Sequence, residues 1–205
     1  MKQIIFIRWG DVWDSLQDFE SYLKEMPYDP YKPEGKRRRE WLKTALPEDS
    51  EMIQMRTPCK ENAHYSTRKI MFEKLIPYLK EDVILVWYSL GSTFLLKYLL
   101  EKDAPKEKIK QLHLVAPFIH ETSERTIGDF AFPTDQIKTL NDSIKNIFIR
   151  SSTDDTICPY SQAETLASLL PTAQLMTFTD RGHFFQPAFP ELLEKIKDYT
   201  PTVLI

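Results

Sequence analysis

The chain has 205 residues, of which 42% are hydrophobic and 28% charged, and its formal net charge at pH 7 is −3. This length suits one compact domain with its own core, and the charge balance gives no reason to expect a nucleic-acid partner. No run approaches the roughly 20 apolar residues of a membrane span, and the apolar run at the N-terminus is too short for a signal peptide. Because Cys59 and Cys158 are the only cysteines, no disulfide framework is expected and we predict a cytoplasmic protein.

Short aliphatic runs alternate with longer amphipathic segments, which is the pattern of an α/β fold. In the first half we expect strand 3–7, helix 15–25, helix 37–45, strand 52–55, helix 66–79 capped by Ser66, strand 83–88 and helix 92–102. In the second half we expect strand 111–115, strand 146–150, helix 161–170, strand 174–178 and helix 190–198. This spacing predicts a mostly parallel sheet with helices on both faces.

The sequence also predicts an amphipathic helix near the N-terminus and a cap in the second half of the chain. The helix 15–25 is expected to be amphipathic, with Leu16, Phe19, Tyr22 and Leu23 on one face. Residues 117–145 are longer than a connection requires, and we expect them to form a small cap on a single domain spanning 1–205.

A serine lies where a buried strand meets a helix. Ser89 stands in Trp87-Tyr88-Ser89-Leu90-Gly91, directly after the apolar run 83–86 and before an apolar helix. A strand, a sharp turn bearing a serine, and then a helix are typical of the nucleophile elbow of α/β-hydrolases. The turn exposes the hydroxyl, and the start of the helix favours the negative charge that develops during acyl transfer.

Two later segments supply the groups that such a serine needs, namely a base and a third group that orients the base. Asp154 and Asp155 follow strand 146–150, and His183 follows strand 174–178. The carboxyl ends of parallel strands meet at one edge of a sheet, so these side chains should lie close to Ser89. Either aspartate can take the acid role on this reasoning.

The segments Ser-Thr-Asp-Asp-Thr-Ile-Cys-Pro (152–159) and Phe-Thr-Asp-Arg-Gly-His-Phe (178–184) closely resemble the acid and base segments of a known family. This family is the small serine hydrolases related to retinoblastoma-binding protein 9, with their small bacterial relatives. The resemblance implies one α/β-hydrolase domain, a triad of Ser89, Asp155 and His183, and no cofactor. It favours Asp155 over Asp154, because Asp155 is followed by three residues and then proline, as in many hydrolases.

The oxyanion hole of such an enzyme is expected to use two backbone N–H groups. One belongs to Leu90, directly after the nucleophile. The other belongs to Trp9 or Gly10 in the loop after the first strand. Gly10 is favoured because it follows the dipeptide that corresponds to His-Gly in many hydrolases.

Aromatic residues stand where the family usually has small or polar ones. Trp87 and Tyr88 replace the usual Gly-His of the elbow, and Trp9 lies in the loop after the first strand. We therefore expect Trp9, Trp87 and Tyr88 to contact the substrate. Phe184 and Phe185 are expected either to line the same pocket or to pack against the last helix. The indole at position 87 also leaves an alternative open, a catalytically impaired or engineered hydrolase-fold protein with an aromatic-lined binding pocket.

The sequence thus predicts a serine hydrolase that acts through an acyl-enzyme on a small-molecule ester or amide. The same intermediate would also serve an acyltransferase. No membrane or nucleic-acid partner is expected, and the protein should be a monomer or a small homo-oligomer. His64, His113 and His120 show no metal-ligand spacing with one another or with the cysteines, so no metal is predicted.

Overall fold

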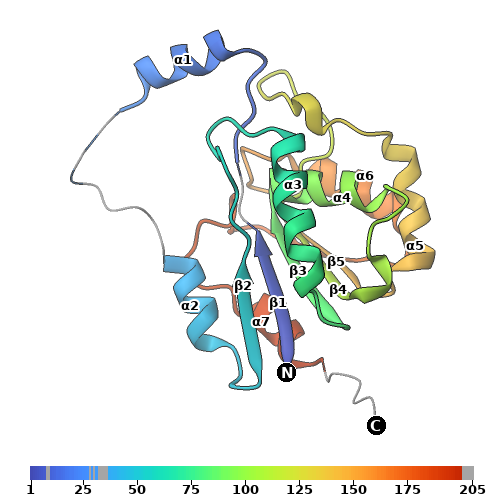
Figure 1. The fold of residues 1–205 in the computed structure, drawn as a ribbon. Helices are drawn as coiled ribbons and strands as arrows, with labels where there is room; N and C mark the ends of the chain where they lie inside the picture. Colours follow the sequence, from blue (N-terminus) through green and yellow to red (C-terminus); the bar gives the residue numbers. More distant parts are fainter. Residues whose placement is uncertain (8–9, 28, 30, 32–36, 200–205) are drawn as a thin grey trace.

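The computed structural model describes residues 1–7, 10–27, 29, 31 and 37–199. Six parallel strands form one sheet in the order β2-β1-β3-β4-β5-β6 (Figure 1). The strands are β1 (Lys2–Ile7), β2 (Ser50–Gln54), β3 (Val83–Tyr88), β4 (Ile109–Val115), β5 (Ile147–Ser152) and β6 (Gln174–Phe178). The predicted α/β class with a parallel sheet is confirmed, and each predicted strand exists with its ends shifted by at most two residues.

The helices include all those predicted, in the predicted order, and one further short helix within 117–145 that was not predicted. They are α1 (Leu16–Glu25), α2 (Arg37–Ala45), α3 (Tyr65–Leu75), α4 (Leu90–Leu99), α5 (Leu140–Ser143), α6 (Tyr160–Leu169) and α7 (Pro190–Lys197). The prediction that Ser66 caps the third helix is wrong, since α3 begins at Tyr65 with His64 at its N-cap. Among the described residues, every helix is too short or too polar to traverse a bilayer.

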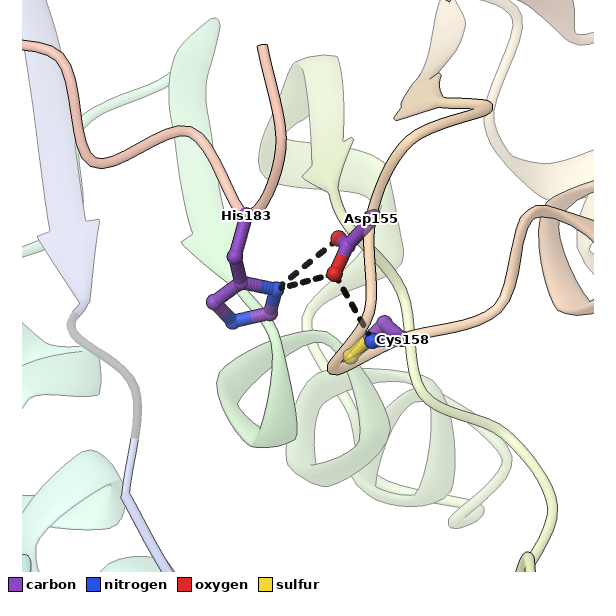
Figure 2. A group of neighbouring side chains, drawn as sticks. All are labelled: Asp155, Cys158 and His183. Atoms are coloured by element: carbon purple, nitrogen blue, oxygen red, sulfur yellow. Dashed lines mark hydrogen bonds and ion pairs between the residues drawn. The ribbon is translucent and has the colours of Figure 1, made fainter.

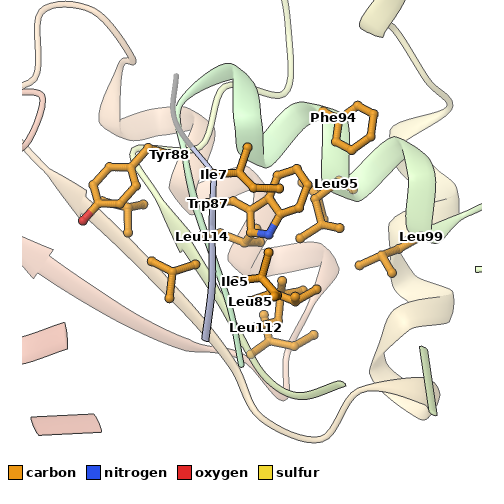
Figure 3. Close-up of a cluster of buried hydrophobic side chains, with 14 of the residues drawn as sticks. Ile5, Ile7, Leu85, Trp87, Tyr88, Phe94, Leu95, Leu99, Leu112 and Leu114 are labelled. Carbon is orange, nitrogen blue, oxygen red and sulfur yellow. The ribbon is translucent and has the colours of Figure 1, made fainter. Parts of the chain in front are cut away.

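The core lies on both faces of the central strands, as a parallel sheet requires. On one face, Trp87 of β3 and its strand neighbours pack beneath α4 (Figure 3). On the other face α7 is tied to the strands, because Gln111 Nε2 donates to Lys195 O at 3.2 Å and Lys2 Nζ donates to Lys197 O at 3.0 Å. This two-sided cover explains why all six residues of β3 are buried.

The amphipathic helix α1 lies apart from the core. It stands away from the sheet in Figure 1, and none of its residues is buried. Leu16 is 64% exposed and Leu23 is 44% exposed. The helix predicted at 15–25 exists, but its apolar face is not buried in the core. A hydrophobic stripe marks a helix that needs cover, but sequence periodicity does not say what supplies that cover.

The segment between β4 and β5 combines short turns with a longer loop. It contains the 3-10 turns η3 (Gly128–Phe130) and η4 (Thr134–Thr139), followed by α5. Phe130, Ile137 and Leu140 are fully buried, so this part is packed into the core. The preceding residues, 118 and 121–126, line a cavity at the carboxyl edge of the sheet.

Candidate active site

The turn between β3 and α4 has the backbone of a nucleophile elbow. Ser89 has φ 52° and ψ −126°, a conformation that a residue with a side chain adopts only at an energetic cost. Its N–H donates to Val115 O at 2.9 Å, and its carbonyl accepts from Ser92 N at 2.8 Å. These bonds hold the strained turn between two buried elements. Ser89 therefore stands at the carboxyl end of β3, where the sheet meets the start of α4.

Asp155 and His183 meet at the same edge of the sheet, from the loops that follow β5 and β6. His183 Nδ1 lies 2.9 Å from Asp155 Oδ2 and 3.2 Å from Oδ1 (Figure 2). The Asp155 side chain is fully buried and that of His183 is 8% exposed. Asp155 Oδ1 also accepts from the N–H groups of Ile157 and Cys158, at 2.8 and 2.9 Å. The carboxylate is thus fixed in one orientation, and with it the imidazole.

The neighbouring Asp154 has a different task. Its Oδ1 accepts from the Gly182 N–H at 2.9 Å and from the Ser152 hydroxyl, and this second bond is the main reason why its pKa lies below the usual value. Asp154 thus ties the loop after β5 to the loop that carries His183. Of the two candidate acids, Asp155 contacts the imidazole and Asp154 braces the backbone beside it.

The Ser89 hydroxyl is next to a thiol. In the part of the chain that the structure describes, its hydrogen-bond partner is Cys158, with 3.6 Å between Oγ and Sγ, and not His183. Burial raises the pKa of the Cys158 thiol to about 12, outweighing the contact with Ser89 that lowers it. The thiol is therefore neutral at pH 7 and is not a competing nucleophile.

Ser89, Leu90, Cys158 and His183 line one cavity of about 640 Å³, together with Gly10. Carboxylates dominate its charged lining, and they belong to Asp11, Asp14, Asp18, Glu121 and Glu124. Arg125 also lines the cavity, and its Nη1 lies 3.6 Å from Asp11 Oδ1. The cavity therefore carries more negative than positive charge around the serine and the histidine.

Gly10 has no room for a side chain. A Cβ at this position would lie 2.0 Å from Arg68 Nη2 and 2.8 Å from Lys60 O. The guanidinium of Arg68 is fully buried behind the glycine, and burial lowers its pKa to about 10. Gly10 and Leu90 both reach the cavity, which is where oxyanion donors must lie. Trp9 falls outside the described residues.

The aromatic residues predicted to contact substrate lie elsewhere. Trp87 is fully buried and stacks on Phe94, with ring centroids 5.3 Å apart and planes 8° apart. Tyr88 lies on the opposite side of β3 from Trp87 (Figure 3), and its ring is 5.4 Å from that of Phe6. Phe184 is 1% exposed and packs on Phe178 and Phe189. None of the three lines the cavity, so the predictions of substrate contact for Trp87 and Tyr88, and the pocket alternative for Phe184, are wrong.

Other aromatic side chains line the cavity, and they are Trp13, Tyr22, Phe118 and Phe185. The sequence can indicate Phe118 and Phe185 as cavity residues, because each follows the carboxyl end of a strand. No sequence pattern indicates Trp13 and Tyr22 as cavity residues, since they reach the cavity only through the placement of α1 and of the loop before it. Because Trp87 is a core residue, it does not obstruct the serine, and its indole gives no reason to expect an impaired site.

The sheet order, the strained turn at Ser89 and the Asp155–His183 pair at the carboxyl edge define the α/β-hydrolase class. Within this class the chain belongs to the family described as serine hydrolase, whose family model matches residues 38–195. The serine hydrolase RBBP9 of Rattus norvegicus is 30% identical over 120 residues, covering 57% of this chain and 61% of the rat protein. This chain therefore aligns with about three fifths of that relative.

Solved structures of other hydrolases share the fold. The ydeN gene product of B. subtilis superposes with a TM-score of 0.71 over 97% of this chain and 98% of its own, at 20% identity. The meta-cleavage product hydrolase CumD of Pseudomonas fluorescens superposes with a TM-score of 0.62 over 96% of this chain and 88% of its own, at 14% identity. At such identities the likeness establishes the α/β-hydrolase fold.

Proposed function

We propose that this serine hydrolase cleaves small esters through a covalent acyl-enzyme, with Ser89 as nucleophile, His183 as general base and Asp155 as the group that orients the base. The observation that carries the proposal is the 2.9 Å contact between His183 Nδ1 and the buried Asp155 carboxylate, beside a cavity that Ser89 also lines. A carboxylate only accepts hydrogen bonds, so Nδ1 carries the proton and Nε2 is left to accept one from Ser89.

The first half of the reaction begins when the Ser89 hydroxyl leaves Cys158 and turns toward His183. Such tightening of a catalytic hydrogen bond upon substrate binding is common. Oγ then attacks the ester carbonyl while Nε2 takes its proton, and the tetrahedral oxyanion forms between the N–H groups of Leu90 and Gly10. Each such donor contributes about 2.7–4 kcal/mol in related enzymes. His183 returns the proton to the departing alcohol, and water releases the acyl group by the same steps.

The cavity indicates which substrates are suitable. Its volume of about 640 Å³ accommodates a small molecule. The five carboxylates of its lining disfavour anionic substrates, so we assign it neutral or cationic esters. Esters are favoured over amides because an alcohol is the better leaving group. Cys59 is free and exposed, which supports a reducing compartment such as the cytoplasm.

The test is labelling with a fluorophosphonate probe, followed by mass-spectrometric identification of the modified residue and by hydrolysis of p-nitrophenyl acetate. We expect the probe at Ser89, and we expect Ser89→Ala to lose labelling and to lower kcat by at least about 10⁴-fold. Ser161→Ala, at an exposed position in α6, is the matched control and should behave like the parent. Equal labelling and turnover by Ser89→Ala would overturn the proposal.

A further inference from the structure

The thiol of Cys158 lies next to Asp155 and His183 of the proposed triad, so three side chains that can bind a metal ion lie close together. One ligand atom from each of Asp155, Cys158 and His183 lies within 4.8 Å of the others, and the first two residues are buried (Figure 2). Carboxylate oxygen, thiolate sulfur and imidazole nitrogen are the three donor types that zinc sites use. The sequence gives no zinc pattern, because the ligands come from two loops that only the sheet brings together.

We propose that Asp155, Cys158 and His183 form a binding site for a thiophilic divalent cation of the Zn²⁺ and Cd²⁺ class, and that its occupation switches off the hydrolase. This inference rests on the proposed function only in its second half, since the cation site itself needs no catalysis. Zinc bonds of about 2.0–2.3 Å in a tetrahedral arrangement place ligand atoms about 3.3–3.8 Å apart. The three groups thus need to move by only about 1 Å to surround an ion.

The balance of protons explains why binding inhibits. The neutral thiol must lose its proton to the solvent in order to bind the cation. The imidazole binds through Nδ1, the nitrogen that faces Asp155 in Figure 2, so its proton moves to Nε2. One proton is released in total, and the bound cation is neutralised by the Asp155 carboxylate and the Cys158 thiolate. With a proton on Nε2, His183 is unable to accept one from Ser89.

The surroundings of the thiol favour a reversible metal switch over a covalent one. Cys158 is 2% exposed, and burial keeps its thiol protonated, so electrophiles and oxidants find little thiolate to attack. A divalent cation that is also bound by Asp155 and His183 displaces this proton when it binds the sulfur. The Ser89 hydroxyl, 3.6 Å from the sulfur, or a water molecule completes the four ligands.

The direct test is a Cd²⁺ titration of the full-length protein. Binding is measured by the ultraviolet charge-transfer absorbance of the cadmium–thiolate bond. We expect a band that saturates at one equivalent in the parent and is lost in Cys158→Ala and in the nearly isosteric Cys158→Ser. Cys59→Ala removes the exposed cysteine and should keep the band. Ser89→Ala should also keep the band, because the three main ligands remain.

The functional test is Zn²⁺ inhibition of p-nitrophenyl acetate hydrolysis, with each variant compared to its own metal-free rate. Loss of an outer-shell partner alone weakens metal sites by about 10- to 100-fold, so Cys158→Ala should raise the apparent inhibition constant more than tenfold. Equal inhibition of the parent and Cys158→Ala, or an equal cadmium band, would overturn the site. A cadmium band in a parent that hydrolyses no ester would contradict the proposed function and leave the metal site standing.

Discussion

Two histidines associated with neighbouring parts of the sheet have opposite surroundings. His183 follows β6, and its Nδ1 faces the carboxylate of Asp155. His113 lies inside β4, is fully buried, and its Nδ1 lies 2.7 Å from Nη1 of Arg150. Its other nitrogen, Nε2, lies 2.9 Å from Gln111 Oε1.

The charge of the partner decides what each imidazole can do. A guanidinium only donates hydrogen bonds, so Nδ1 of His113 accepts and Nε2 donates to Gln111. Burial, together with the Arg150 charge, holds the pKa of His113 well below 6.5, and the ring stays neutral with both nitrogens engaged. The carboxylate beside His183 instead accepts from Nδ1 and leaves Nε2 available for the proposed role as a base. In the proposed mechanism, the carboxylate partner and the access to a cavity make His183, and not His113, the candidate base.

The largest expected effect comes from making the partner of His183 resemble that of His113. In Asp155→Asn the amide N–H₂ can donate to Nδ1, which then favours a proton on Nε2, the wrong tautomer for a base. We expect kcat for p-nitrophenyl acetate to fall by about 10⁴-fold, the loss that the same change causes in Ser-His-Asp proteases. Asp154→Asn is the matched control, and its kcat should fall much less. An equal fall in kcat for both variants would contradict the assignment of Asp155 as the group that orients His183.

The second test compares the phenylalanines that pack on the two rings. Phe148 is 4% exposed and stacks on His113 at 4.7 Å, whereas Phe185 is 66% exposed and meets His183 edge-on at 5.3 Å. Phe148→Ala should lower the free energy of unfolding by about 3–5 kcal/mol because it leaves a cavity. Phe185→Ala should change it by less than about 0.5 kcal/mol. Urea unfolding measures the free energy of unfolding of both variants. Similar decreases for the two would contradict the expected difference between a buried and an exposed phenylalanine.

The third test leaves both histidines in place and changes two glycines of the proposed site. Gly10→Ala brings a Cβ against Arg68 and Lys60 O, so the loop with the proposed oxyanion donor must shift. We expect kcat to fall by about 10²–10³-fold. Gly182 has φ +48° with nothing within 4 Å of an added Cβ, so Gly182→Ala should cost about 1–2 kcal/mol of stability. A larger loss of kcat in Gly182→Ala than in Gly10→Ala would contradict the role of Gly10.

The smallest expected effect is the dependence of stability on pH caused by His113. Because its pKa is lowered in the folded state, the unfolded chain binds the extra proton below about pH 6.5, where unfolded histidines titrate. Stability is therefore complete above this pH and falls as the pH drops, by at most about 1.4 kcal/mol per unit from this one group. His113→Gln should show a shallower slope in urea unfolding between about pH 5 and pH 8. An unchanged slope would contradict this origin.

Much of the fold follows from local sequence patterns. Strand β6 has the predicted bounds, and every predicted strand and helix is present in the predicted order, because aliphatic runs and amphipathic periods are local properties. Of the described α-helices and strands, only the short helix α5 was not predicted. Trp87 shows where this reasoning fails. Both faces of a buried parallel strand are apolar, so the sequence does not indicate which neighbour faces the cavity and which the core. Helix α1 is a related case, since periodicity identifies its apolar face but not whether that face is buried.

The sequence by itself determined the α/β class, the elbow at Ser89, and the order of the serine, acid and base segments. It could do so because a parallel sheet brings the carboxyl ends of its strands to one edge, wherever they lie along the chain. Only the tertiary structure decided that Asp155 contacts His183 while Asp154 braces the adjoining loop, that Trp87 belongs to the core, and that the Cys158 thiol lies beside Ser89. These outcomes depend on loop conformation and on packing between distant segments, which local sequence patterns do not specify.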